Sequence, residues 1–275
     1  MGDSERVPRP GCVHADDDGL RSAAVAAGGT HVALLYASTV DEWHRSLGPA
    51  APDTCHFVSV DDAVRSATAT NGTGRAVGGG MYVSVLERPV ADPSPVLADA
   101  FEGTSGGSLV VDDLSVLLRD ADDAATALER LQTVATDASA ELHVGLPDDA
   151  EAATTVARHF TPVDDATARV VASEGLSYLR EADPTNFGYL RRHWEEARAG
   201  LEAVEMTYPQ AKQVHAALRE PETTPRTLGA ALGGLVELGA LDVWGDTVAA
   251  NRYDLTAYDP ERVAAIGDAI DSLDD

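Results

Sequence analysis

The fold of this chain is decided most clearly by residues 208–255, which read YPQAKQVHAALREPETTPRTLGAALGGLVELGALDVWGDTVAANRYDL. A helix is predicted over residues 208–219 and ends at a Pro-Glu-Thr-Thr break. A second helix is predicted over residues 224–239, because Pro225 is favoured at a first helical position and glycine closes the run. The segment therefore contains two helices joined by a turn.

Two short strands are predicted directly after these helices. Residues 241–244 and 252–255 alternate apolar with polar side chains around a tip at 245–250, which is the spacing of a β-hairpin. Helix, turn, helix and hairpin in this order are typical of a winged helix-turn-helix. The usual function of that module is to bind duplex DNA.

The second helix of this segment is predicted to carry the recognition surface. Its buried stripe is formed by Leu228, Leu232, Leu235 and Val236. The side chains predicted to face outward are those of Arg226, Thr227, Ala230, Gly233 and Glu237. The residues predicted to contact DNA are Lys212, Gln213, Thr224, Arg226, Thr227 and Arg252.

Each of these contacts has a chemical reason. Arg226 is suited to guanine O6 and N7 or to a phosphate, and the free N–H groups of the helix start at Thr224 are suited to a phosphate. Lys212 and its neighbour Gln213 are expected beside the DNA backbone, and Arg252 in a minor groove or on its phosphates. The alternative for each residue is a solvated surface position. Gly233, Gly234 and Glu237 argue against DNA binding, since glycine reads no base and a carboxylate repels phosphate.

The charge of the chain is opposite in sign to that of ordinary DNA-binding domains, which are basic. There are 46 acidic and 20 basic residues, the net charge is -26, and Lys212 is the only lysine. Such acidity with few lysines resembles proteins of extremely halophilic archaea. In salt near 1 M the Debye length is about 3 Å, so the acidic residues of the chain weaken DNA binding little. Attraction to phosphates is also weak at such salt, so binding must depend on direct contacts with the DNA. The charge itself is explained by solubility.

Length and composition predict two globular domains in a cytoplasmic protein. The 275 residues contain no apolar run of about 18 residues and no secretory signal. We predict a flexible N-terminal arm over 1–29, an α/β domain over 30–182 and a winged helix-turn-helix domain over 183–275. Asp183-Pro184 marks the second border, with an N-cap followed by proline. Cys12 and Cys55 have no zinc-site spacing, and a disulfide is not expected in a reducing cytosol.

The fold class predicted for the first domain is α/β, with a mainly parallel sheet and flanking helices, because short apolar runs alternate with helical stretches. Strands are predicted over 32–36, 56–60, 82–86, 109–111, 142–145 and 168–171. Helices are predicted over 40–47, 61–68, 95–101, 124–138 and 150–160.

The order of these elements resembles the core of RecA/KaiC-type P-loop ATPases. Ser108 to Asp113 stand where the Walker B strand and its acidic residue would be. The loop at residues 37–42 reads ASTVDE, so it lacks the two glycines and the lysine of a P-loop. The glycine-rich stretch at 71–80 ends in no Lys-Thr pair and is predicted to be a flexible loop. The resemblance therefore implies a degenerate domain without catalysis.

No enzymatic, metal or cofactor site is predicted. Asp112 and Asp113 would need substrate phosphates to hold magnesium, and a structural role is favoured. The histidines show no HxxxH or HxH spacing, and no serine lies in a GxSxG elbow.

A long amphipathic helix is predicted over residues 185–206. Its apolar seam is formed by Phe187, Leu190, Trp194, Ala197, Leu201 and Val204. The seam either closes the three-helix core of the winged domain or contacts a second copy of the chain. Winged-helix regulators usually act as dimers on two half-sites, so a homodimer is expected.

The C-terminal residues resemble a family of haloarchaeal proteins that join a degenerate RecA/KaiC-like domain to a winged helix. The resemblance is carried by TNFGYLRRHW at 185–194 and WGDT at 244–247. It implies a transcriptional regulator that binds double-stranded DNA, whose N-terminal domain mediates dimerisation, partner contact or sensing. The alternative is an interaction module without DNA binding that partners an active RecA-like ATPase.

Overall fold

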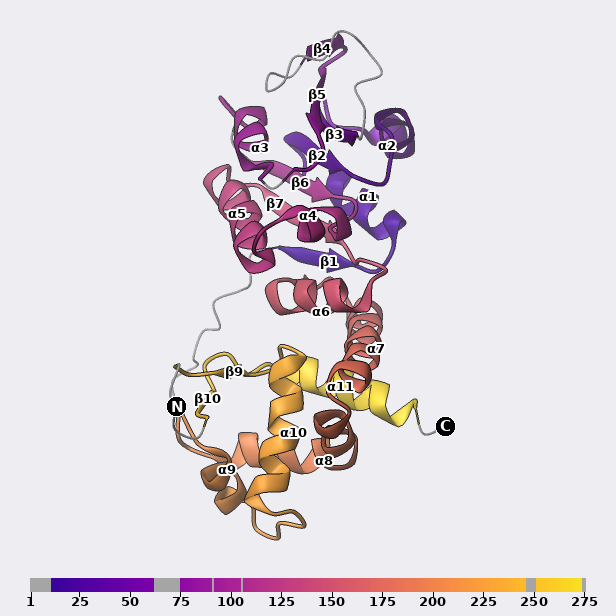
Figure 1. Cartoon of the computed structure of the whole chain (residues 1–275). Coiled ribbons are helices and arrows are strands. Elements are labelled where there is room, and N and C mark those ends of the chain that lie inside the picture. Colours follow the sequence, from indigo (N-terminus) through magenta and orange to yellow (C-terminus); the bar gives the residue numbers. More distant parts are fainter. Residues whose placement is uncertain (1–10, 62–74, 91, 105, 246–250, 274–275) are drawn as a thin grey trace. The chain divides into compact units, whose positions relative to one another are not determined.

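The chain is described by a computed structural model that covers residues 11–61, 75–90, 92–104, 106–245 and 251–273 (Figure 1). These residues form two compact units that divide between Val163 and Asp164. The first unit is an α/β domain with a mostly parallel sheet flanked by helices, as the sequence predicts. The second unit is mainly helical.

The sheet of the first unit has eight strands among the described residues, in the order β4-β5-β3-β2-β6-β7-β1-β8. Every neighbouring pair is parallel except β4 and β5. The strands are β1 (Cys12–His14), β2 (Thr30–Leu35), β3 (Thr54–Asp61), β4 (Arg75–Gly78), β5 (Met81–Glu87), β6 (Gly107–Val111), β7 (Glu141–Gly145) and β8 (Thr161–Pro162).

Helices cover both sides of this sheet. In Figure 1, α1 and α2 lie on one side and α3 and α5 on the other. Every residue of β2 and of β6 is buried, which fits the apolar runs at residues 32–35 and 109–111. The helical segments are α1 (Asp17–Ala26), α2 (Val40–Leu47), the short 3-10 helix η1 (Gly48–Ala50), α3 (Ser94–Ala100), α4 (Ser115–Asp120), α5 (Ala124–Asp137) and α6 (Ala150–His159).

Five consecutive parallel strands define the topology of the sheet. These strands lie in the spatial order β5-β3-β2-β6-β7. If they are numbered 1 to 5 in chain order, this is the order 3-2-1-4-5 of a doubly wound sheet. The direction of winding reverses between β2 and β6, which pair along their length from Thr30 to Leu34. In such sheets ligands bind outside the carboxyl ends of the strands at this reversal.

The prediction of a flexible arm over 1–29 is wrong for the residues that the structure describes there. Strand β1 pairs with β7 and β8, and Leu20 and Ala24 of α1 are fully buried. The Asp-rich run that suggested a loose arm is a helix start: the Asp16 carboxylate accepts the N–H of Gly19 at 2.7 Å, and two further aspartates occupy the first turn. Residues 1–10 lie outside the described part.

Most other elements predicted for the first domain are confirmed within a few residues at their ends; two differ, and one lies almost wholly outside the described part. The run at 168–171 is not a strand but part of a helix, because a short apolar run fits either structure. Residues 75–78 of the glycine-rich stretch form β4 instead of a loop. Asp61 ends β3, and residues 62–68 of the helix predicted there lie outside the described part.

The second unit is built from five helices and a two-stranded antiparallel hairpin in its described residues. They are α7 (Asp165–Ala182), α8 (Pro184–Ala203), α9 (Ala211–Ala217), α10 (Pro225–Glu237), β9 (Asp242–Val243), β10 (Tyr253–Asp254) and α11 (Pro260–Asp271). The hairpin pairs Val243 with Tyr253 as the sequence predicts, and the residues 246–250 of its predicted tip lie outside the described part. α9 is shorter than the predicted helix at both ends.

The apolar seam of α8 is buried inside this unit. Leu190, Ala197 and Leu201 belong to one core with residues of α7, α10 and α11, and Phe187, Trp194 and Val204 pack against it. A Cβ placed on Gly267 of α11 would lie 2.4 Å from the Trp194 ring, so glycine is required for this packing. The first of the two readings of the seam is therefore correct, and the seam closes the core.

The division between the units differs from the predicted border at residue 183. Asp183 does begin a helix, since its carboxylate accepts the N–H groups of Thr185 and Asn186 at 3.1 and 3.0 Å. However, the preceding helix α7 buries Leu176 and Leu179 in the core of the second unit. A helix belongs to the domain that covers its apolar face, and α7 is covered by α8 and α11.

Candidate functional site

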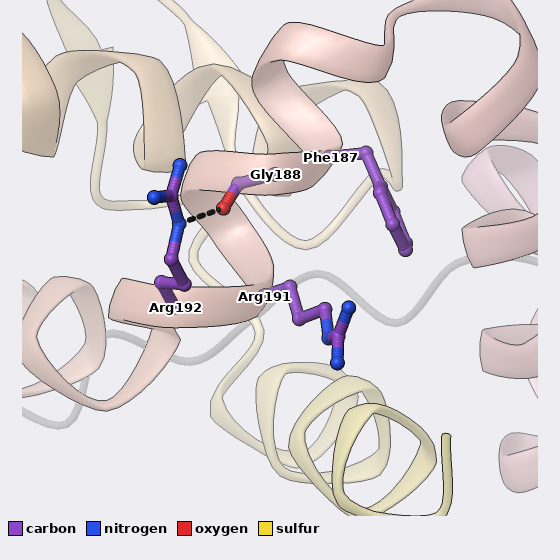
Figure 2. A pocket seen from close by; sticks show the side chains of 4 residues that line it. All are labelled: Phe187, Gly188, Arg191 and Arg192. Atoms are coloured by element: carbon purple, nitrogen blue, oxygen red, sulfur yellow. Dashed lines mark hydrogen bonds between the residues drawn. The ribbon is translucent and has the colours of Figure 1, made fainter. Parts of the chain in front are cut away.

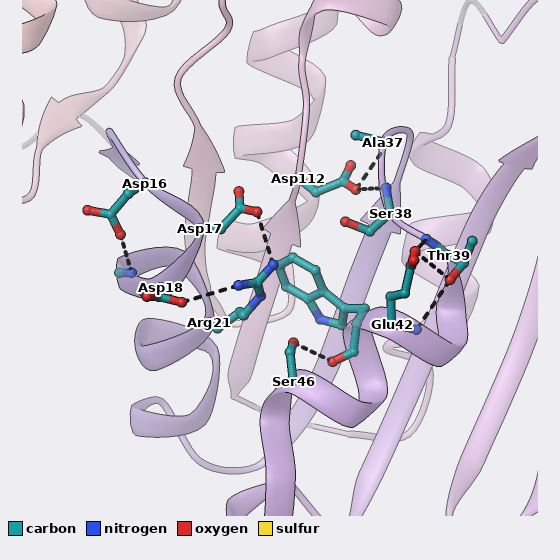
Figure 3. A network of polar contacts seen from close by, with 12 residues as sticks. Asp16, Asp17, Asp18, Arg21, Ala37, Ser38, Thr39, Glu42, Ser46 and Asp112 are labelled. Atoms are coloured by element: carbon teal, nitrogen blue, oxygen red, sulfur yellow. Dashed lines mark hydrogen bonds and ion pairs between the residues drawn. The ribbon is translucent and has the colours of Figure 1, made fainter.

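The reversal point of the sheet contains a carboxylate bound by consecutive backbone amides (Figure 3). Asp112 follows β6, and the loop after β2 donates to it from the N–H groups of Tyr36, Ala37 and Ser38 at 2.7, 3.1 and 2.7 Å. The next amide, that of Thr39, donates to Glu42 at 3.1 Å in a capping box. Four successive N–H groups are therefore taken by carboxylates of the chain itself.

These are the amides that would receive a phosphate in a nucleotide-binding loop. From the sequence, the carboxylates expected where a phosphate would bind are those of Asp41 and Glu42 in the same loop. In the structure, the carboxylate that accepts most of these amides is that of Asp112, which is remote in sequence. Burial raises the pKa of Asp112, and its backbone donors oppose that shift. Asp113 accepts the N–H of Ser115 at 2.8 Å at the start of α4. Both aspartates thus have structural contacts.

Two groups of buried histidines lie elsewhere in the sheet. The indole Nε1 of Trp43 donates to His31 Nε2 at 3.1 Å, so His31 Nδ1 carries the proton and donates to Ser108 Oγ at 2.8 Å. His14 Nε2 lies 3.1 Å from His143 Nδ1 because β1 pairs with β7, a proximity that the spacing of the histidines in the sequence does not reveal. Burial lowers the pKa of His31 to about 4.

Three potential nucleophiles of this unit, Ser108, Cys12 and Cys55, are partly or fully buried. Ser108 is fully buried, and its hydroxyl donates to the Ala24 carbonyl at 3.3 Å. Cys12 and Cys55 are free thiols, and burial raises the pKa of both, that of Cys55 to about 11. Over the described residues, no cluster of three or more His, Cys, Asp or Glu side chains is arranged to hold a metal ion.

The second unit contains a cavity of about 360 Å³ between α9, α10 and the hairpin. Lys212 of α9 and Arg226 of α10, both exposed, line it together. The other lining residues are Gln210, Ala211, Pro225, Gly229, Asn251 and Tyr253. No carboxylate is among them, although acidic residues outnumber basic ones 46 to 20 in the chain. The cavity brings together two of the residues predicted to contact DNA.

Three other predicted residues serve mainly to start the helices. Thr224 caps α10 by accepting the N–H of Thr227 at 3.2 Å, and the two hydroxyls lie 3.0 Å apart. Gln213 accepts the N–H of Gln210 at 2.8 Å at the start of α9. The polar groups of these three residues make hydrogen bonds within the chain, so they fix the helix starts more than they offer donors or acceptors to a ligand.

Arg252 lies on the opposite face of the hairpin from this cavity. Asn251 and Tyr253 line the cavity, and side chains alternate between the two faces of a strand. Arg252 Nη1 donates to the Tyr208 carbonyl at 3.3 Å, and the Tyr208 ring lies 5.0 Å from that of Trp244. The Trp244 side chain is 47% exposed. Sequence reasoning missed Asn251 and Tyr253, which the same alternation would have placed together.

α10 is enclosed along most of its length. A Cβ on Gly229 would lie 3.2 Å from Ala211 of α9, and one on Gly233 would lie 3.2 Å from Asn186 of α8. Gly234 faces Leu190 in the core. The prediction that Gly233 faces outward is therefore wrong, because glycine at this position lets α8 approach closely.

The connection from α9 to α10 is held by contacts from both sides. It covers residues 218–224, which is longer than the three to four residues of a compact helix-turn-helix turn. The Glu196 carboxylate of α8 accepts the N–H groups of Glu222 and Thr223 at 3.0 and 3.2 Å. His215 contacts the Thr223 carbonyl at 2.8 Å. These bonds position the start of α10 and hence Arg226.

A second basic surface lies on α8 (Figure 2). It is an open hollow of about 550 Å³ lined by Phe187, Gly188, Arg191 and Arg192. Arg192 Nε donates to the Gly188 carbonyl at 2.8 Å, and its guanidinium lies 5.4 Å from the centre of the Tyr189 ring. The hollow is formed by a single helix and has fewer converging groups than the cavity at Lys212.

None of the described helices is both long enough and apolar enough to span a bilayer. Comparison of the chain with protein-family models, curated proteins and solved structures found no match.

Proposed function

We propose that this chain is a DNA-binding transcriptional regulator whose second unit is a winged helix-turn-helix. The observation that carries the proposal is the cavity whose described lining residues include Lys212 and Arg226 and no carboxylate. The order α9, connection, α10 and β9–β10 hairpin is the order of elements in winged-helix domains. α8 and α11 complete the core that holds α10 in place.

The acidity of the chain is compatible with this function at high salt. At an ionic strength near 1 M, charges that are farther apart than about 3 Å are largely screened. A DNA phosphate held directly by Lys212 and Arg226 would then interact with these two groups more strongly than with the rest of a chain whose net charge is -26. We propose a cytoplasmic protein of a halophilic organism on this basis.

The first unit is proposed to mediate dimerisation, contact with a partner or sensing, without catalysis. The resemblance to RecA/KaiC-type ATPases rests on the order of the elements and on Ser108 to Asp113 at the Walker B position, and Asp112 follows β6 there. A nucleotide phosphate would have to displace this carboxylate from three backbone amides. Titration of the full chain with ATP and magnesium is therefore expected to leave its unfolding temperature unchanged. A concentration-dependent increase would show that the site binds nucleotide.

A second candidate function is that of an interaction module partnering an active RecA-like ATPase. It is favoured by the outward face of the hairpin, where Trp244, Tyr208 and Arg252 lie together. Trp, Tyr and Arg are the residue types that dominate the binding energy of protein interfaces. Under this alternative, Trp244→Ala abolishes partner binding and the chain has no affinity for duplex DNA.

The proposal is tested by titrating labelled duplexes with the full chain from about 0.1 to 1 M KCl, across the range in which screening changes most. We expect binding that weakens as KCl rises and that is weaker in the Lys212→Ala, Arg226→Ala double variant than in the wild-type chain. Absence of binding throughout this range would refute the proposed function. Absence of duplex binding, together with partner binding that Trp244→Ala abolishes, would favour the interaction module.

A further inference from the structure

The cavity at Lys212 and Arg226 has the chemistry of a phosphate site. Neither side chain makes an ion pair with another described residue of the chain, and both are exposed where they border the cavity. Arginine presents a planar fork of donors and lysine a compact point charge. Together they match a group with a full negative charge and several acceptor oxygens.

A guanine edge matches this pair poorly. It offers two acceptors, O6 and N7, which a single arginine satisfies. The second cation of the cavity would then be brought against the DNA without a partner, and burying an unpaired charge is costly. The placement of Lys212 beside Arg226 thus favours a phosphate over a base as the ligand of Arg226.

The exposed part of α10 offers little else to read bases. After Thr227, whose hydroxyl is shared with Thr224, Gly229 and Gly233 face α9 and α8, and Ala230 and Val236 are half-buried. The next polar side chain is that of Glu237, about 15 Å farther along the helix axis at 1.5 Å per residue. Backbone and small apolar groups can follow the shape of a groove but distinguish bases poorly.

The cavity is also held in a fixed shape. Gly229 of α10 packs closely against Ala211 of α9, which sets the spacing of the two cations. The Tyr253 hydroxyl donates to the Gly229 carbonyl at 3.3 Å and fixes the hairpin to α10. Packing therefore fixes the backbone positions from which the two exposed side chains project.

We propose that Lys212 and Arg226 clamp a single backbone phosphate of duplex DNA, and that α10 discriminates little between base sequences. The inference rests on the proposed DNA-binding function and specifies its ligand. The chain then recognises duplex DNA by its backbone and shape, and Arg226 contributes affinity instead of sequence preference.

The experiment selects duplexes with the full chain from a randomised library and measures the salt dependence of binding on the unselected pool. The variants are Lys212→Gln, Arg226→Gln and their combination, and Lys212→Arg keeps the charge. Arg180→Gln is the matched control, because it removes one exposed positive charge on α7, outside the residues that line the cavity. Circular dichroism establishes that each variant is folded.

We expect no enriched motif, and we expect the double variant to lose about 0.9 in the slope of log K against log[KCl], the value for one phosphate of B-DNA. Lys212→Arg and Arg180→Gln are expected to keep the wild-type slope. A slope loss of about 1.8 in the double variant would mean two separate phosphates and would overturn the shared clamp.

A motif bound about 10³-fold more tightly than the pool, the lower end of specific recognition, would overturn the lack of base discrimination. Both results leave the DNA-binding function standing. If no duplex is bound at any salt concentration, the proposed function itself fails.

Discussion

The buried histidine of the first unit predicts a specific dependence of stability on pH. His31 is fully buried, and its ring joins the Trp43 indole to Ser108 in the neutral form. Burial lowers its pKa from 6.5 to about 4, with a smaller contribution from His143. Between these two values the unfolded chain binds a proton that the folded chain does not.

The sign and size of the effect follow from this difference. Because the folded pKa is the lower one, stability is fully present above pH 6.5 and is lost as the pH falls toward 4. One pKa unit corresponds to about 1.4 kcal/mol, so the free energy of unfolding is expected to decrease by about 3 kcal/mol through His31 alone. His56 and His143, whose pKa values burial also lowers, act in the same direction.

The contribution of His31 is isolated by comparison with His31→Gln. Glutamine keeps an acceptor for the Trp43 indole but does not titrate. The chain has three tryptophans, so replacing Trp194 and Trp244 by phenylalanine leaves Trp43 as the fluorescent reporter of the first unit. Urea unfolding at constant KCl is then measured between about pH 8 and 4, on either side of the ordinary histidine pKa.

We expect the advantage of the histidine form over His31→Gln to shrink by about 3 kcal/mol across this range. A difference that stays constant with pH would refute the reasoning, because it would mean that His31 titrates alike in both states. Equal m-values in the two proteins are the control that the same unit unfolds.

The packing of the structure gives three further predictions. Gly267→Ala places a Cβ 2.4 Å from the Trp194 ring and is expected to destabilise the second unit by about 1–3 kcal/mol in thermal unfolding. The control is Gly188→Ala on α8, where the nearest atom to the added Cβ is 3.8 Å away, and this variant should be as stable as the wild type or more stable. Glu196→Gln weakens the bonds that hold residues 218–224, so hydrogen exchange of that segment should become faster and duplex binding weaker; unchanged exchange would contradict its role. Asp112→Asn places an amide N–H₂ group, which is a donor, against backbone N–H donors, and it should destabilise the first unit by about 1–3 kcal/mol in urea unfolding. An unchanged urea midpoint would show that the carboxylate is dispensable.

Several elements could be predicted from the sequence because their signals are local. The apolar stripe of α5 recurs at helical spacing, and Leu128, Leu131 and Val134 are buried as it predicts. Thr224 and Pro225 begin α10 at the predicted position, and the alternation around Val243 and Tyr253 gives the hairpin. In each case the capping group or the repeat lies within a few residues of the structure that it specifies.

The functional surfaces needed the tertiary structure for a physical reason. A side chain's partners across the sheet or between helices are set by packing, which leaves no trace in local spacing. Asp112 reaches the amides of Tyr36 to Ser38 over more than 70 residues, and only the pairing of β6 with β2 brings them together. Lys212 and Arg226 were each identified in the sequence, but the approach of α9 to α10 decides that they share one cavity.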